Sequence, residues 1–198
     1  ALFVLAAPAG AVNLIANGGF EASSDPFATP PGWTNIGPSN GVVAYESFGP
    51  TPYEGEYFYD IGGYGSPSPA PGTGIFQSVA TTPGARYTLT FGYSGENSFG
   101  TSILDVLIGS QLTQFTLTPD GSVALQRPLV STSIDYLALG SSTDISFTIN
   151  AASDSGSNDP LIDGVIFELA SAIPEPATWE PALSRHELIR RRRLPTPR

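Results

Sequence analysis

The carboxylates are the first residues of this chain whose types and spacing suggest chemistry. Hydrolysis of a glycosidic bond needs two carboxyl groups on either side of a cleft. Five acidic residues are formally available for such a pair: Glu54, Glu56, Asp60, Asp154 and Asp159. Acids in solvated loops have the same spacing, and acidic side chains are mostly exposed in folded proteins. We therefore favour solvated acids and keep glycoside hydrolysis as an alternative.

Other kinds of catalysis lack the residues they need. A Ser-His or Cys-His pair requires a base within hydrogen-bond reach of the nucleophile, and a zinc site requires His or Cys ligands. The chain has no Cys, and its single histidine is His186, near the end of the sequence. These two classes of site and any disulfide are therefore excluded from residues 12–173. We predict a protein that is not an enzyme.

Aromatic residues are concentrated in the Gly- and Pro-rich first third of the chain. They are Tyr45, Phe48, Tyr53, Tyr57, Tyr59 and Tyr64, with Trp33 just before them. Sugars stack their C–H faces on aromatic rings, while amides and acids bind the hydroxyl groups. The tyrosines, with Glu96 and Asn97 from a facing loop, therefore form a candidate carbohydrate-binding surface. The alternative for these tyrosines is packing in the core, because period-two spacing puts Tyr57 and Tyr59 on one face.

The charges divide the chain into an acidic body and a basic tail. Residues 1–173 carry fifteen acidic side chains against Arg86 and Arg127, whereas residues 174–198 carry three against six arginines. An acidic surface repels phosphate groups and attracts cations. We therefore expect no nucleic-acid partner for the body.

Alternation of apolar and polar residues predicts a β-structure. The clearest case is residues 86–93, where Tyr87, Leu89, Phe91 and Tyr93 share one face. Further strands are predicted over 75–79, 103–108, 114–117, 134–139, 145–149 and 165–169, with a hairpin turn at Asp120-Gly121. Eight or more short strands without a helical stripe predict an all-β fold, with residues 12–173 forming a two-sheet antiparallel β-sandwich.

Five segments of the body occur in a characteristic order: 13–21 (NLIANGGFE), 31–33 (PGW), 75–78 (IFQS), 83–91 (PGARYTLTF) and 161–165 (LIDGV). This series resembles the galactose-binding-like jelly-roll domains of carbohydrate-binding modules, which also occur in many PEP-CTERM proteins. The resemblance covers roughly residues 13–170 and implies a jelly-roll sandwich with Trp33 of the Pro-Gly-Trp pattern in its core. The family often has a second acid before the Val of the last strand, where this chain has Gly164.

The resemblance also implies a structural calcium ion between the first and last strands. By this resemblance Glu21 and Asp163 are the side-chain ligands, with main-chain carbonyls near Asn17 and in 55–60 as helpers. Several oxygen ligands from meeting loops are what Ca²⁺ takes in proteins. The alternative is that both carboxylates accept main-chain N–H bonds in turns.

The beginning of the chain has features of a secretion signal. Residues 2–7 are apolar and are followed by Ala9-Gly10-Ala11, a small-x-small cleavage pattern. We therefore expect residues 1–11 to be the remnant of a signal peptide in a longer precursor, and a short buried strand is the alternative.

The end of the chain carries Pro174-Glu175-Pro176, with Arg190-Arg191-Arg192-Arg193 further on. This pattern resembles the PEP-CTERM sorting signal, which implies an exosortase partner in a Gram-negative, exopolysaccharide-producing bacterium. Residues 180–189, where the family has a membrane helix, are polar and too short to cross a bilayer. The 174–198 tail thus lacks the helix, either through a reading-frame or assembly error or as a released variant.

Together these features predict an exported or surface-exposed protein that binds extracellular polysaccharide without catalysis. The alternative is a structural surface protein without a specific ligand.

Overall fold

The computed structural model describes residues 12–23, 25–37, 41–45, 50–63, 71–95, 100–118, 128–153 and 159–170. Within these ranges the chain forms ten strands and no helix, so none of them contains a helix that could span a membrane. The strands are β1 (Thr34–Ile36), β2 (Val42–Tyr45), β3 (Tyr57–Asp60), β4 (Gly74–Ala80), β5 (Arg86–Gly95), β6 (Ser102–Ile108), β7 (Gln111–Leu117), β8 (Val130–Leu137), β9 (Ser142–Ile149) and β10 (Pro160–Leu169). The predicted turn at Asp120-Gly121 and the two export segments lie outside the described residues.

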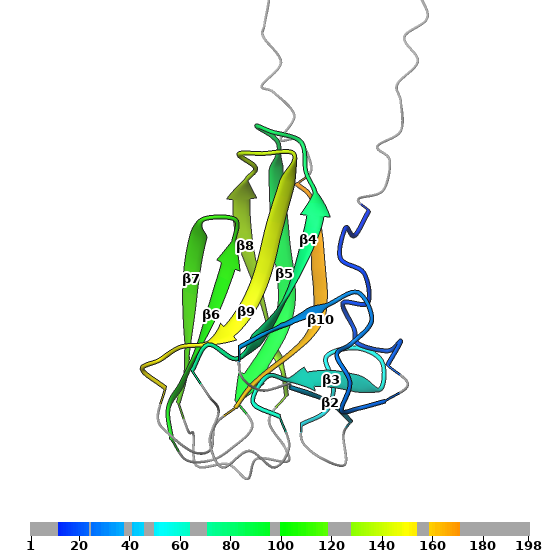
Figure 1. Cartoon of the computed structure of the whole chain (residues 1–198), viewed down its shortest axis with the longest axis vertical. Helices are drawn as coiled ribbons and strands as arrows, with labels where there is room; N and C mark the ends of the chain where they lie inside the picture. The colour runs from blue at the N-terminus through cyan, green and yellow to red at the C-terminus, as the bar shows by residue number, and fades with distance from the viewer. Residues whose placement is uncertain are drawn as a thin grey trace, which may run out of the picture.

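The strands form two five-stranded sheets that face each other (Figure 1). Sheet A has the order β1-β4-β9-β6-β7, and sheet B has the order β2-β3-β10-β5-β8. Every strand pair is antiparallel, and successive strands repeatedly change sheets. The predicted all-β, two-sheet antiparallel sandwich is therefore confirmed.

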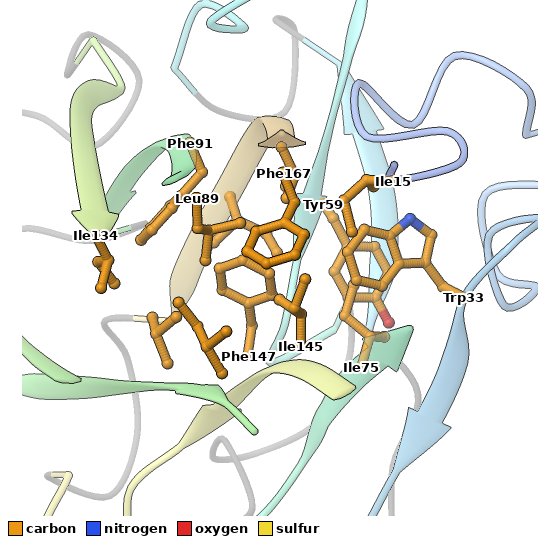
Figure 2. Close-up of a cluster of buried hydrophobic side chains, with 14 of the residues drawn as sticks. Ile15, Trp33, Tyr59, Ile75, Leu89, Phe91, Ile134, Ile145, Phe147 and Phe167 are labelled. Carbon is orange, nitrogen blue, oxygen red and sulfur yellow. The ribbon is translucent and has the colours of Figure 1, made fainter. Parts of the chain in front are cut away.

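The core consists of the alternate side chains that point from each sheet toward the other (Figure 2). Leu89 and Phe91 of β5 and Phe167 of β10 meet Ile145 and Phe147 of β9, and all five are fully buried. The rings of Phe91 and Phe147 lie 5.1 Å apart in an edge-to-face arrangement, which aromatic pairs prefer. Period-two alternation in the sequence therefore corresponds to the inward and outward faces of the sheets.

The segment before β1 joins the first part of the chain to the last strand. β3 pairs with β10 only at Leu161 and Ile162. Further along the same edge, Leu14 N–H donates to the Phe167 carbonyl at 2.8 Å, and Asn13 Oδ1 accepts the Phe167 N–H at 2.9 Å. The N-terminal segment thus occupies the edge of β10 that β3 leaves open, as its position beside β10 in Figure 1 also shows.

The N-terminal segment also contacts sheet A through a buried glutamine. Gln77 of β4 accepts the Ala16 N–H through Oε1 at 2.7 Å and donates through Nε2 to the Ala16 carbonyl at 3.1 Å. Trp33 lies in the core as expected, and its Nε1–H donates to the Asn17 carbonyl at 3.1 Å. Residues 13–17 are therefore fixed to both sheets.

Candidate functional site

The outer face of sheet B is rich in hydroxyl groups. On β5, Leu89 and Phe91 point into the core, so Thr88, Thr90 and Gly92 point outward. In the register of the β5–β8 pair these three residues lie opposite Asp135, Ser133 and Ser131 of β8. Both serines are exposed, and Thr88 donates to Asp135 Oδ1 at 3.0 Å. This face, with Ile166 and Glu168 of β10 opposite Thr90 and Thr88, is the candidate ligand surface.

Tyr53 lies against this outer face. Its ring occupies the space beside two glycines, so that an added Cβ would lie 2.7 Å from Tyr53 Cγ at Gly92 and 2.6 Å from Tyr53 Cδ1 at Gly164. These two glycines belong to the neighbouring strands β5 and β10. Tyr53 as a whole residue keeps 44% of its surface exposed. Tyr53 therefore presents an accessible ring next to the serine and threonine hydroxyls.

Asp163 holds the main chain of Tyr53 to the sheet. Its Oδ2 accepts the N–H groups of Tyr53 at 2.8 Å and of Glu54 at 3.0 Å, and its Oδ1 accepts the Gly164 N–H at 2.6 Å. The side chain has no exposed surface. Burial raises the pKa of the Asp163 carboxyl to about 7, against the lowering effect of these N–H donors, and the nearby Glu54 carboxylate raises it further.

Gly164 begins an irregularity in β10 that makes this arrangement possible. The register of β10 against β5 shifts between Asp163 and Ile166, and Gly164 has a φ of 57°. An extra residue in the left-handed region is typical of a β-bulge that begins with glycine. The position where the resemblance expects a second acid is thus a bulge glycine beside the Tyr53 ring.

Glu21 holds the other end of the same loop. Its Oε1 accepts the N–H groups of Glu56 at 2.8 Å and Tyr57 at 2.9 Å. Gly55 has a φ of 62°, and a Cβ at this position would collide with the Glu21 carboxylate. The first segment and the last strand therefore meet at the 53–57 loop, with Glu21 on one side and Asp163 on the other.

These contacts bear on the predicted calcium site. Both Asp163 oxygens and Glu21 Oε1 accept main-chain N–H groups, which was the alternative to metal binding. The Asn17 carbonyl accepts Trp33 Nε1–H and the Phe20 N–H, while Asn17 Oδ1 accepts the Ala22 N–H. The described residues contain no group of three or more His, Cys, Asp or Glu side chains that could hold a metal ion. In this arrangement Asn17, Glu21 and Asp163 have hydrogen-bond partners within the protein, which a calcium ion would have to replace, and calcium binding by them stays a prediction.

The structure separates the tyrosines that the sequence grouped together. Tyr59 is fully buried and stacks on Phe20 with ring centroids 5.3 Å apart, and burial raises the pKa of its hydroxyl well above its ordinary value. Its expected place in the ligand surface is therefore corrected to the core. Tyr57 is half-buried and packs against the core.

The remaining predicted ligand residues are only partly within the described ranges. Tyr45 lies in β2, without a described side chain. Tyr64 and Asn97 lie outside the described residues, as does the sorting motif Pro174-Glu175-Pro176.

The carboxylates considered for hydrolysis have varied positions. Asp60 is buried, and its Oδ1 accepts the N–H groups of Gly62 at 2.9 Å and Gly63 at 3.2 Å. Asp159 is also buried, and Asp154 lies outside the described residues. Glu54 and Glu56 flank Gly55 in the 53–57 loop.

Sequence reasoning missed two features of the surface around Tyr53. Nothing was inferred from Gly92 in the sequence, and Gly164 was treated only as a departure from the family pattern. The signal that could have found Gly92 is a glycine inside an otherwise regular strand, which often marks the close approach of another group. The sequence contains no comparable signal that the serines of β8 belong to this surface.

Comparison with known proteins identifies the fold. A carbohydrate-binding module of family 61, solved in complex with β-1,4-galactotriose, superimposes with a TM-score of 0.51 at 18% identity over 80% of this chain and 99% of that one. A xylan-binding domain of family 22 gives a TM-score of 0.50 at 15% identity over 78% of this chain and 93% of that one. The CBM22-1-GH10 modules of Clostridium thermocellum xylanase 10B, solved with xylohexaose, superimpose with a TM-score of 0.50 at 15% identity. The match covers 79% of this chain and 28% of that one.

No family model and no curated protein sequence matches the chain. The structural likeness therefore shows the fold alone, which is the two-sheet jelly-roll sandwich that these carbohydrate-binding modules also have.

Proposed function

We propose that this domain is a non-catalytic module that binds extracellular polysaccharide on the outer face of sheet B. The observation that carries the proposal is the exposed ring of Tyr53 beside a hydroxyl-rich face. A ring of this kind stacks on the C–H face of a sugar, and neighbouring hydroxyl groups can exchange hydrogen bonds with the sugar hydroxyls. A jelly roll with the same fold was solved with galactotriose, and another is described as a xylan-binding domain, which supports a carbohydrate ligand.

The charges on the outer face of sheet B favour a neutral polysaccharide. Asp135 and Glu168 lie on the outer face of sheet B, and Glu54 follows Tyr53 directly. Arg86, at the start of β5 and on the same outward face, is the one arginine among the residues that the structure describes, so these three acids outnumber it. An acidic surface repels an anionic chain and does not repel a neutral one. We therefore infer that uronic-acid-rich or sulfated polysaccharides bind weakly.

Titration of the full chain against a panel of polysaccharides tests this function. We expect retention by a neutral polymer such as xylan, galactan or a β-glucan, and about tenfold or more weaker binding of the Tyr53→Ala variant. Tyr53→Phe is the matched control, because it keeps the ring. No binding to any member of the panel would favour the structural surface protein, whereas new reducing ends released from a polymer would favour the glycosidase.

We also propose that the protein is exported to the cell surface or medium, with an exosortase acting on the tail if the tail is functional. The apolar residues 2–7 and Pro174-Glu175-Pro176 support this. The test is to express the protein in a host that has an exosortase and to fractionate the cells. Replacing Pro174, Glu175 and Pro176 by alanine should change the location or processing. An unchanged distribution would contradict a role for the motif.

A further inference from the structure

We propose that Gly92 is a positioning residue, because it makes room for the Tyr53 ring and so fixes the sugar-stacking surface. The inference rests on the proposed function and goes beyond it by naming what orients the ring. It follows from the position of Gly92 in β5, from the bulge at Gly164 and from the hydrogen bonds of Asp163.

The backbone of Gly92 does not itself require glycine. Gly92 lies in the middle of β5 and is not among the residues with a positive φ, whereas Gly164 is, with a φ of 57°. Glycine inside a strand is less favourable than alanine, because it loses more conformational freedom on folding. Another group must therefore need the space that a Cβ at position 92 would fill.

The Tyr53 side chain is that group. A Cβ on Gly92 would lie 2.7 Å from Cγ, 2.8 Å from Cβ and 3.1 Å from Cδ2 of Tyr53. A Cβ on Gly164 would lie 2.6 Å from Cδ1 and 3.2 Å from Cε1 of the same ring. The two glycines are neighbours across the β5–β10 pair, since Gly92 lies opposite Asp163. The ring thus spans two adjacent strands at the point where both lack a side chain.

Asp163 fixes the ring from its main-chain side. The Tyr53 N–H donates to Asp163 Oδ2 at 2.8 Å, so the Cα of Tyr53 is held over β10 while its ring contacts both glycine positions. A side chain that is already oriented loses less conformational entropy when a ligand binds. Displacing the ring should therefore weaken sugar binding even when the ring is still present.

Gly92→Ala is the sharpest test, and Gly140→Ala is its matched control. Alanine at position 92 puts a methyl group where the ring lies, whereas a Cβ at position 140 would have no neighbour closer than 3.5 Å. We expect Gly92→Ala to weaken binding of the neutral polysaccharide by about tenfold, as Tyr53→Ala does, and the control to bind like wild type. The Tyr53→Ala, Gly92→Ala double variant should bind no more weakly than Tyr53→Ala alone.

Two results separate this inference from the proposed function. If Tyr53→Ala loses binding and folded Gly92→Ala does not, the inference fails and the proposed function stands. If Tyr53→Ala binds every polysaccharide like wild type, Tyr53 is not the stacking ring and both fail.

A measurement without ligand tests the same contact. Nuclear Overhauser effects should connect the Tyr53 ring protons to the Hα protons of Gly92 and Gly164 in the full chain. Their absence from the wild-type protein would overturn the inference. If Gly92→Ala does not fold, Gly164→Asn serves instead, because asparagine tolerates a positive φ better than most residues and its Cβ would also displace the ring.

Discussion

Asp163 Oδ2 accepts the main-chain N–H of Tyr53 at 2.8 Å, although the two residues are 110 positions apart in the sequence. The same oxygen accepts the Glu54 N–H, so one buried carboxyl group attaches the loop before β3 to the last strand. Loop and strand are therefore not independent, and the protonation state of this carboxyl group affects both.

The stability of the protein should depend on the protonation of Asp163. Because the pKa in the folded state, about 7, is higher than the ordinary value of 3.8, the folded protein binds a proton more tightly than the unfolded chain. The stability that this group contributes is full below about pH 4 and is lost as the pH rises through 7. We expect urea unfolding in the presence of EDTA to show a decrease of order 2–4 kcal/mol across this window.

Asp163→Asn should remove most of that pH dependence, because asparagine does not titrate. Asp144→Asn, at an exposed position of β9, is the control and should keep the wild-type slope. Equal slopes for wild type and Asp163→Asn would show that the pH dependence has another origin.

Calcium binding at Glu21 and Asp163 stays a prediction. The stabilisation that a bound calcium ion would give has the opposite pH dependence to the stabilisation by protonated Asp163. A bound cation needs ionised carboxylates, so its stabilising effect would grow as the pH rises. The prediction expects millimolar CaCl₂ to raise the melting temperature relative to EDTA, and Glu21→Gln to abolish the difference. A melting temperature that is the same with calcium and with chelator would leave the N–H bonds of Glu21 and Asp163 as the attachment of the loop.

Gln77→Ala should destabilise the domain at the junction of β4 with the N-terminal segment. The substitution removes both hydrogen bonds to Ala16 and leaves the N–H and carbonyl groups of Ala16 without these partners. We expect a loss of about 1–3 kcal/mol in the free energy of unfolding, and faster hydrogen exchange at the Ala16 amide. Ser78→Ala, at the next and exposed position of the same strand, should change stability by less than about 0.5 kcal/mol. Equal effects of the two substitutions would contradict the role of Gln77.

The sequence predicted the strands whose two faces have different surroundings. Residues 86–93 alternate because Leu89 and Phe91 face the core while Thr88 and Thr90 face outward. β3 was not among the predicted strands, although the spacing of Tyr57 and Tyr59 was noted, because its apolar and polar residues do not alternate in this way. Phe58 packs with Ala44 and Leu161 on one side, and Tyr59 lies in the main core on the other. A strand that is apolar on both faces gives no period-two pattern.

The candidate site was predictable only where a side chain carried the signal. Glu21 and Asp163 were singled out, and the structure brings both to the 53–57 loop. Their partners, however, are main-chain N–H groups, which any sequence provides. The place of Tyr53 depends on the register of β5 against β10, and that register is set by contacts between distant residues.

The attachment of residues 13–17 to β10 and β4 constrains the order in which the chain can fold. Asn13 and Phe167 bond across 154 positions, so this edge forms only after almost the whole body has been synthesised. Contacts between such distant residues are slow to form. In a nascent chain, residues 13–17 consequently cannot attach to β10 until β10 has been synthesised. If the protein is exported as proposed, a translocation machinery that accepts only unfolded polypeptides could bind the chain during that interval.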